Sequence, residues 1–195
     1  MTREQLEHAI RAACDIANEA SVVVFGSQAV LGQHPDASPL LRQSIEADIA
    51  PGSNDAGAAD RIDGALGEDS AFHATHGFYV HGLTIEAAIL PRGWERRTVA
   101  VDGRGAEKAI GRCIEAHDLA ASKLAAFREK DRDFVRTLLA EGVVNARKLR
   151  LRIGQLAASP VPPETLVRWL EATVDEIQLA GRKQRVHTKA APLAG

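Results

Sequence analysis

Two acidic residues separated by one apolar residue are the clearest candidates for chemistry in this chain. Glu46 and Asp48 stand in residues 44–49, where polar and apolar residues alternate in the pattern of a half-buried strand. In such a strand the two carboxylates point to the same face, roughly 6.6 Å apart along the chain. A divalent cation would relieve their mutual repulsion, so the pair predicts a site for one metal ion or for two.

A second candidate site lies upstream, where residues 21–25 form a short apolar run rich in β-branched residues, which predicts a buried strand. The run ends at Gly26 and Ser27. A glycine and a small hydroxyl residue at the carboxyl end of a strand allow backbone amides and the hydroxyl group to converge on an anion, so a phosphate group is expected here. The alternative is an ordinary turn, followed by a surface strand whose two acids are solvated.

At these residues the chain resembles the polymerase β-like nucleotidyltransferase superfamily, whose signature is a Gly-Ser turn, a spacer and a strand of alternating acids. The resemblance implies that Gly26 and Ser27 hold the terminal phosphates of a nucleoside triphosphate. It also implies that Glu46 and Asp48 hold the metal ions, for which Mg²⁺ is expected. Residues 32–43 make the spacer longer than is usual in that superfamily.

A third acid, usually on a neighbouring strand, completes the metal site in that superfamily and can take the proton of the attacking hydroxyl group. Two residues are candidates for this position: Glu86, and His81 in place of an acid. Glu86 has the alternative of an ordinary loop or edge acid, and His81 has the alternative of an ordinary turn residue. Together with His81, His73 and His76 also suggest a zinc site. The Gly and aromatic residues around them indicate irregular or extended chain and no Cys joins them, so zinc is not favoured.

Residues 117–128 predict a strong helix in which Lys123 emerges from a small, apolar stretch, and Lys130 and Asp131 follow before the next apolar run. Over residues 22–139 the chain is similar to the abortive-infection AbiEii-type nucleotidyltransferases and related bacterial proteins, which carry a lysine and a Lys-Asp pair in this arrangement. The resemblance implies that the lysine contacts nucleotide phosphates. It also implies that the later acid supports the site or acts as a base.

These helix residues have structural alternatives as well. Lys123 would then be a helix-surface ammonium group paired with a nearby acid, and Asp131 would be the N-cap of the second helix. Arg128 ends the same helix as Lys123, and of the elements expected to flank the site only this helix is basic. Arg128 is therefore expected to help bind the nucleotide.

The composition is that of an ordinary globular chain. Of its 195 residues, 45% are hydrophobic and 26% are charged, and the formal net charge of −2 gives no global attraction to nucleic acid. Cys14 and Cys113 are far apart, so we expect buried free thiols rather than a metal cluster or a disulfide. Charged residues interrupt the N-terminal segment, which argues against a signal peptide or a membrane span and makes the cytoplasm the expected location.

We therefore predict an α/β fold, with a small mixed β-sheet of nucleotidyltransferase type, covering helices and a helical C-terminal region. Residues 1–115 are expected to form the nucleotidyltransferase-like core, residues 116–181 a helical region packed on that core, and residues 182–195 a disordered tail. A basic cluster at 147–152 is interpreted as a solvated helix face, with contact to a polyphosphate or an RNA backbone as the alternative.

The function expected from the resemblance is Mg²⁺-dependent transfer of a nucleoside monophosphate from a nucleoside triphosphate to a hydroxyl acceptor. The acceptor is left open between RNA, a protein and a small molecule, and no membrane partner is expected. The resemblance also allows a toxin–antitoxin role with an antitoxin partner, or a homodimer. The alternative function is a non-catalytic nucleotide-binding or regulatory module with the same fold.

Overall fold

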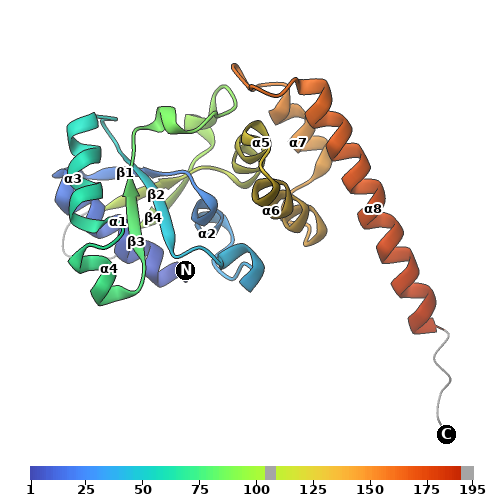
Figure 1. The fold of residues 1–195 in the computed structure, drawn as a ribbon, viewed down its shortest axis with the longest axis horizontal. Coiled ribbons are helices and arrows are strands. Elements are labelled where there is room, and N and C mark those ends of the chain that lie inside the picture. The colour runs from blue at the N-terminus through green and yellow to red at the C-terminus, as the bar shows by residue number, and fades with distance from the viewer. Residues whose placement is uncertain (104–108, 190–195) are drawn as a thin grey trace, which may run out of the picture.

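In this computed structural model, which describes residues 1–103 and 109–189, the chain forms a five-stranded mixed β-sheet with helices packed on it (Figure 1). The strands are β1 (Ser21–Val24), β2 (Glu46–Pro51), β3 (Tyr79–Gly82), β4 (Val99–Asp102) and β5 (Ile110–Cys113). Their order across the sheet is β3-β2-β1-β5-β4, with β1 parallel to β5, β2 parallel to β3, and the β1–β2 and β4–β5 pairs antiparallel. This architecture confirms the predicted α/β fold.

One face of the sheet is covered by α1 (Arg3–Ala17), which contacts β1, β2 and β5. Thr2 is the N-cap residue of this helix, and its reciprocal pair of hydrogen bonds with Gln5 satisfies two free backbone amides. Ala47 and Ile49 of β2 are fully buried, since they face this layer. Because side chains alternate along a strand, the acids between them point to the opposite face.

The chain between β2 and β3 folds into α3 (Ala56–Leu66), which packs on α1 and β3, and α4 (Ala71–His76). The hydroxyl group of Ser70 caps the start of α4, and Gly77 ends it in the left-handed region with φ 71°. The irregular or extended chain predicted around His73 and His76 is therefore wrong, because a serine cap and a glycine stop define a short helix there.

The chain between β3 and β4 does not follow its local sequence pattern. Residues 83–85 are strand-like in sequence, but β3 ends at Gly82 and two short 3₁₀ helices follow, η3 (Ile85–Ala87) and η4 (Trp94–Arg97). The side chain of Asn54 accepts a hydrogen bond from the backbone N–H of Ile85 and so draws the chain away from the sheet. A bend predicted at residues 103–105 lies partly outside the described residues.

A second layer covers the side of the molecule towards which the acids of β2 point. It consists of α5 (Ala116–Ala126), α6 (Glu129–Ala140) and α7 (Ala146–Ile153). This layer contacts the short elements that lead from β1 to β2: α5 contacts η1 (Ser27–Ala29) and α2 (Val30–Gln33), and α6 contacts η2 (Pro39–Arg42). Leu31, Leu124 and Leu138 are fully buried in one continuous core, so the helical layer is fixed directly to the chain around Ser27.

The last helix, α8 (Pro163–Lys189), packs on α7 and α6 through the buried Leu166 and Leu170 and then extends away from the body (Figure 1). The helix continues through Gly181 to Lys189, since extending an existing helix requires far less ordering than starting one, and the disordered tail expected at 182–195 stays a prediction. Residues 190–195 lie outside the described residues. No helix in the described part combines the length and apolar character needed to cross a membrane.

A buried ionic network surrounds Asp118 of α5, whose side chain is completely inaccessible to solvent. The guanidinium group of Arg97 donates two hydrogen bonds to it, at 2.7 and 3.0 Å, from the η4 segment. Arg152 of α7 forms an ion pair with the same carboxylate, with Nε 2.9 Å from Oδ1. Asp118 therefore ties the chain before β4 to the helical layer.

A second buried network lies beside the first. The carboxylate of Glu115 accepts hydrogen bonds from His117 Nδ1 at 2.6 Å and from Lys148 Nζ at 2.9 Å. His117 Nε2 accepts the backbone N–H of Asn145 at 2.9 Å, so the ring links Glu115 to the start of α7. Burial alone would raise the pKa of Glu115, but the hydrogen bonds from His117 and Lys148 outweigh it and lower the pKa to about 2.

These networks change the interpretation of the basic cluster at 147–152. Lys148 and Arg152 are held by buried acids, and Arg150 pairs with Glu171 of α8. The expectation of a solvated helix face is therefore wrong for Lys148 and Arg152, whose charges bind buried acids, whereas Arg147 and Arg150 are exposed as expected. Cys14 and Cys113 are buried free thiols, as predicted.

Candidate functional site

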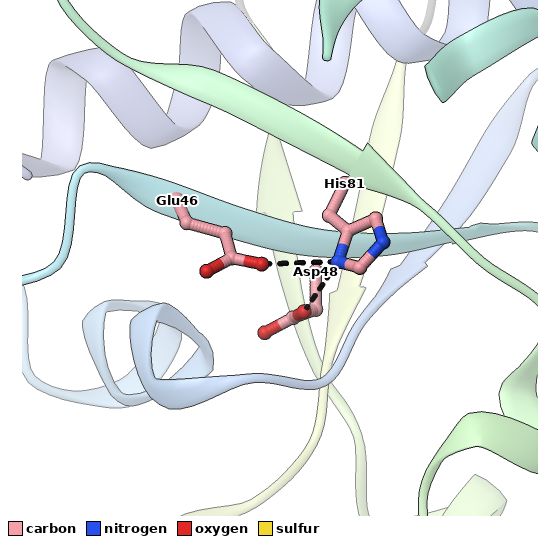
Figure 2. A group of neighbouring side chains, drawn as sticks. All are labelled: Glu46, Asp48 and His81. Atoms are coloured by element: carbon pink, nitrogen blue, oxygen red, sulfur yellow. Dashed lines mark hydrogen bonds and ion pairs between the residues drawn. The ribbon is translucent and has the colours of Figure 1, made fainter. Parts of the chain in front are cut away.

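The side chains of Glu46, Asp48 and His81 converge on the face of the sheet away from α1 (Figure 2). Parallel pairing of β2 with β3 places His81 directly opposite Asp48. His81 Nδ1 lies 3.0 Å from Glu46 Oε1 and 3.7 Å from Asp48 Oδ1. The side chains are 34%, 24% and 43% exposed in the order Glu46, Asp48, His81, so a solvent-borne ligand can reach all three.

Gly26 allows the chain after β1 to pass directly over the acidic pair. The backbone N–H of Phe25 donates to the carbonyl oxygen of Asp48 at 3.1 Å, which continues the β1–β2 ladder to the end of the strand. A Cβ atom added at Gly26 would lie 1.6 Å from Asp48 Oδ2. The position therefore requires glycine because of this close approach, and it brings Ser27 to the edge of the acidic pair.

A cleft of about 740 Å³ lies over this group. One wall of the cleft carries the acids of β2 and the Gly26 turn. A second wall carries Lys123 from α5, Arg128 from the turn after α5, and Lys130 from α6. Leu40 also lines the cleft and is largely exposed. The cleft thus brings together a group of possible metal ligands, a glycine turn and several cations, which come from segments far apart in the sequence.

Two of these cations, Lys123 and Arg128, are held by Asp131. Its buried carboxylate, 1% exposed, lies 3.3 Å from Lys123 Nζ and 2.6 Å from Arg128 Nε. Helix α5 ends at Ala126 because Phe127 adopts the left-handed conformation, and Arg128 then becomes the N-cap residue of α6. Asp131 lies in the first turn of α6 and is not its N-cap, so the N-cap alternative is wrong.

Charge in the cleft is unevenly balanced. Burial, and then the neighbouring charge of Glu46, raise the pKa of Asp48 above its usual value. Lys123, His81 and Lys130 act in the opposite direction but do not cancel these effects. The folded protein therefore holds an acid in an unfavourable ionised form, a condition that a bound cation would relieve.

Most of the residues expected at the site meet in this cleft: Gly26, Ser27, Glu46, Asp48, His81, Lys123, Arg128 and Asp131. Glu86 does not join them. Its fully exposed carboxylate accepts two hydrogen bonds from the side chain of Asn54, at 2.9 and 3.0 Å, on the loop side of η3. Of the two candidates for the third position, His81 therefore lies beside the acids and Glu86 does not.

Phe134 is a residue of the cleft that the sequence reasoning missed. Its ring centroid lies 5.9 Å from Lys123 Nζ, and the ring lines the cleft on α6. Helical spacing carries the signal, since Phe134 follows Asp131 by three positions and therefore shares its face. The apolar run around Phe134 is typical of core packing, so its sequence does not mark Phe134 as a residue of the cleft.

The donor set fits a divalent metal ion. Glu46, Asp48 and His81 each offer one ligand atom, and these atoms all lie within 4.8 Å of one another. Two carboxylate oxygens and an imidazole nitrogen are ordinary ligands for such ions. Gly26 leaves room for Asp48 Oδ2, because any side chain at that position would overlap the carboxylate.

The sheet, the acidic strand and the glycine turn define a nucleotidyltransferase-like protein. The chain belongs to the family described as nucleotidyltransferase of unknown function (DUF6036), whose model matches residues 4–177. Comparison with curated proteins and with solved structures finds no match. The family match extends over both layers, so the helices that carry Lys123 and Asp131 are part of the family's domain.

Proposed function

We propose that this protein transfers a nucleoside monophosphate from a nucleoside triphosphate to a hydroxyl acceptor in a divalent-metal-dependent reaction. The observation that carries the proposal is the position of Glu46 and Asp48 under the Gly26 turn, in one cleft with Lys123 and Arg128. Glu46 and Asp48, with His81, would hold the metal ion, expected to be Mg²⁺, which would neutralise phosphate charge. Family membership supports the same class of chemistry.

In the proposed reaction the acceptor oxygen forms a bond to the α-phosphorus, and the bond between that phosphorus and the bridging oxygen to the β-phosphate breaks. Pyrophosphate leaves with the electron pair of that bond, and the proton of the acceptor hydroxyl passes to a carboxylate of the acidic pair. Ser27 and the amides of its turn would bind the terminal phosphates. Lys123 and Arg128 would stabilise the charge that grows on the leaving pyrophosphate.

Asp131 is assigned to positioning in this scheme. Its carboxylate is almost completely buried and is already bound by Lys123 and Arg128, so it is poorly placed to take a proton from a substrate. It holds both cations at the wall of the cleft and offsets part of their charge before the nucleotide binds. A base role for Asp131 is therefore not part of the proposal.

We also propose that the protein is related to the AbiEii-type nucleotidyltransferases, a kinship that would indicate its partners. The AbiEii-type kinship rests on Lys123, Lys130 and Asp131, of which the first and last form an ion pair in the cleft. A toxin–antitoxin role, an antitoxin partner or a homodimer would follow from that kinship. We expect the reaction to take place in the cytoplasm, where nucleoside triphosphates are available.

The test is a titration of the purified protein with each nucleoside triphosphate, without metal ion and with Mg²⁺ or Mn²⁺ in turn, followed by transfer of label from an α-³²P nucleotide. We expect metal-dependent binding that Asp48→Ala abolishes. Asp60→Ala is the matched control, because Asp60 is an exposed acid on α3, away from the cleft. Absence of metal-dependent binding, or binding that is unchanged in Asp48→Ala, would contradict the proposal.

The alternative function, a non-catalytic nucleotide-binding module, is favoured by one observation. The acidic group contains His81 where a third carboxylate would be expected, and Glu86 lies elsewhere. Under this alternative the wild-type protein binds a nucleotide but releases no pyrophosphate and labels neither RNA nor protein. Release of pyrophosphate that depends on Asp48 would reject it.

A further inference from the structure

The third member of the acidic group is an imidazole, and this changes which ion the group prefers. We propose that the cleft selects a first-row transition-metal ion such as Mn²⁺ over Mg²⁺, and that His81 Nδ1 is the ligand responsible. The inference deepens the proposed function and rests on it, since it takes the ion to serve the nucleotide site. It names a different resident ion from the Mg²⁺ that the sequence predicts.

The geometry suits a single ion. Two ligand atoms that are each about 2.1 Å from one ion lie at most about 4.2 Å apart. The three ligand atoms are within 4.8 Å of one another, and His81 Nδ1 is already 3.0 Å from Glu46 Oε1 and 3.7 Å from Asp48 Oδ1. Small side-chain rotations are therefore enough to close the group around an ion, and all three side chains are partly exposed and free to make them.

The direction of His81 supports the same assignment. Figure 2 shows its Nδ1 directed into the space between the two carboxylates rather than away from them. The register of β2 with β3 fixes the imidazole on this face, because a shift of one residue would turn it to the other side of the sheet. Nδ1 thus stands in the position that a third ligand requires.

The donor chemistry gives the selectivity. Mg²⁺ favours oxygen ligands in near-ideal octahedral geometry, whereas imidazole nitrogen suits transition metals, and Mn²⁺ accepts carboxylates as well. An imidazole in place of a third carboxylate also removes one negative charge from the group. Lys123 and Lys130 act on Asp48 with positive charge, which further weakens a purely electrostatic attraction for a hard ion. These effects weaken Mg²⁺ binding more than the binding of an ion that gains from nitrogen ligation.

The test measures the affinities of the full-length protein for Mn²⁺ and Mg²⁺ by calorimetry, and nitrogen coupling to bound Mn²⁺ by pulsed electron paramagnetic resonance. The wild type is expected to bind Mn²⁺ with ¹⁴N coupling from one imidazole. His81→Ala should lose the coupling and about tenfold or more in Mn²⁺ affinity, since even substitutions outside the ligand shell cost about 10–100-fold. His81→Asp should lower the ratio of Mn²⁺ to Mg²⁺ affinity by about tenfold or more. His34→Ala, which changes a histidine outside the cleft, should leave both readouts unchanged.

Absence of ¹⁴N coupling in the wild type, or an affinity ratio unchanged in His81→Asp, would overturn the inference. If label transfer occurs and depends on Asp48 while the coupling is absent, the inference alone fails. If the coupling and the shifted ratio are found but no transfer occurs, the metal assignment stands and the proposed reaction fails. Because His81 is 43% exposed, both of its substitutions should leave the fold intact.

Discussion

Two groups of acids in this protein use the same residue types and reach opposite electrostatic states. In the cleft, Glu46 and Asp48 lie beside His81, and all three are partly exposed. Beneath the helical layer, Glu115 and Asp118 are at most 8% exposed, and each is held by two partners. The difference lies in solvent access and in the completeness of pairing.

The pKa values follow this difference. Burial and the Glu46 charge raise the pKa of Asp48, whereas hydrogen bonds overcome the effect of burial at Glu115 and lower its pKa to about 2. A fully paired acid stabilises the fold and has no capacity left for a ligand. An incompletely paired acid costs stability and is available to a cation. The buried networks are therefore structural, and the cleft is the candidate functional site.

The largest expected effect on stability is that of Asp118→Asn. The substitution hardly changes size but leaves Arg97 and Arg152 without their buried counter-charge. Breaking a buried pair on one side costs about 3–5 kcal/mol, so the free energy of unfolding should fall by that amount in urea denaturation. A loss below about 1 kcal/mol would show that Asp118 is no more structural than the acids of the cleft.

The Glu115 network should give a pH-dependent contribution of about 3 kcal/mol, from the difference between its usual pKa of 4.5 and its folded value of about 2. Because the folded pKa is depressed, this contribution is present above pH 4.5 and is lost as the pH falls towards 2. The measurement compares the free energy of unfolding of the wild type and Glu115→Gln across this range. The gap between them should shrink as the pH falls, and a constant gap would contradict the assignment.

Lys123→Met should weaken nucleotide binding by about 1.5–3 kcal/mol, which is the usual worth of a hydrogen bond to a charged group. The fold should survive, because Arg128 still pairs with Asp131. Lys148→Met is the control, since its ammonium group binds Glu115 outside the cleft and should leave nucleotide affinity unchanged. Calorimetric titration with the nucleotide measures both, and equal losses in the two variants would remove Lys123 from the site.

The smallest expected effect is that of Glu171→Ala. Glu171 pairs with Arg150, but the two side chains are 58% and 59% exposed. Exposed ion pairs contribute about 0–1 kcal/mol, so the free energy of unfolding should change by no more than that. A larger loss in urea denaturation would mean that exposure does not separate the structural ion pairs from the weak ones in this protein.

The fold and the acidic pair could be predicted because their signals are local. Alternation along residues 44–49 places Glu46 and Asp48 on one face, and Thr2 caps its helix through residues of the first turn. These features depend on neighbours within a few positions, which periodicity and capping rules describe. The expectation that Gly26 lies beside the acids came from the family signature, and the structure adds its cause, close approach to Asp48.

The remaining features depend on strand register and long-range packing. Choosing between His81 and Glu86 requires knowing that β3 pairs His81 with Asp48 and ends at Gly82. Likewise, nothing near Asp118 in the sequence indicates that Arg97 and Arg152 will meet there. The sequence shows an acid at the start of a helix, and only the packing of distant segments makes it a buried ionic centre.

The most direct measurement is the shift in the free energy of unfolding that a saturating nucleoside triphosphate and metal ion produce in three proteins: the wild type, Asp48→Asn and Glu115→Gln. A ligand at 100 times its dissociation constant stabilises a protein by about 2.7 kcal/mol. The wild type and Glu115→Gln should both show this shift, although Glu115→Gln starts from a lower free energy of unfolding. Asp48→Asn should show no shift, although its own free energy of unfolding is unchanged or higher. A full shift in Asp48→Asn, or its loss in Glu115→Gln alone, would contradict the division between a functional cleft and a structural network.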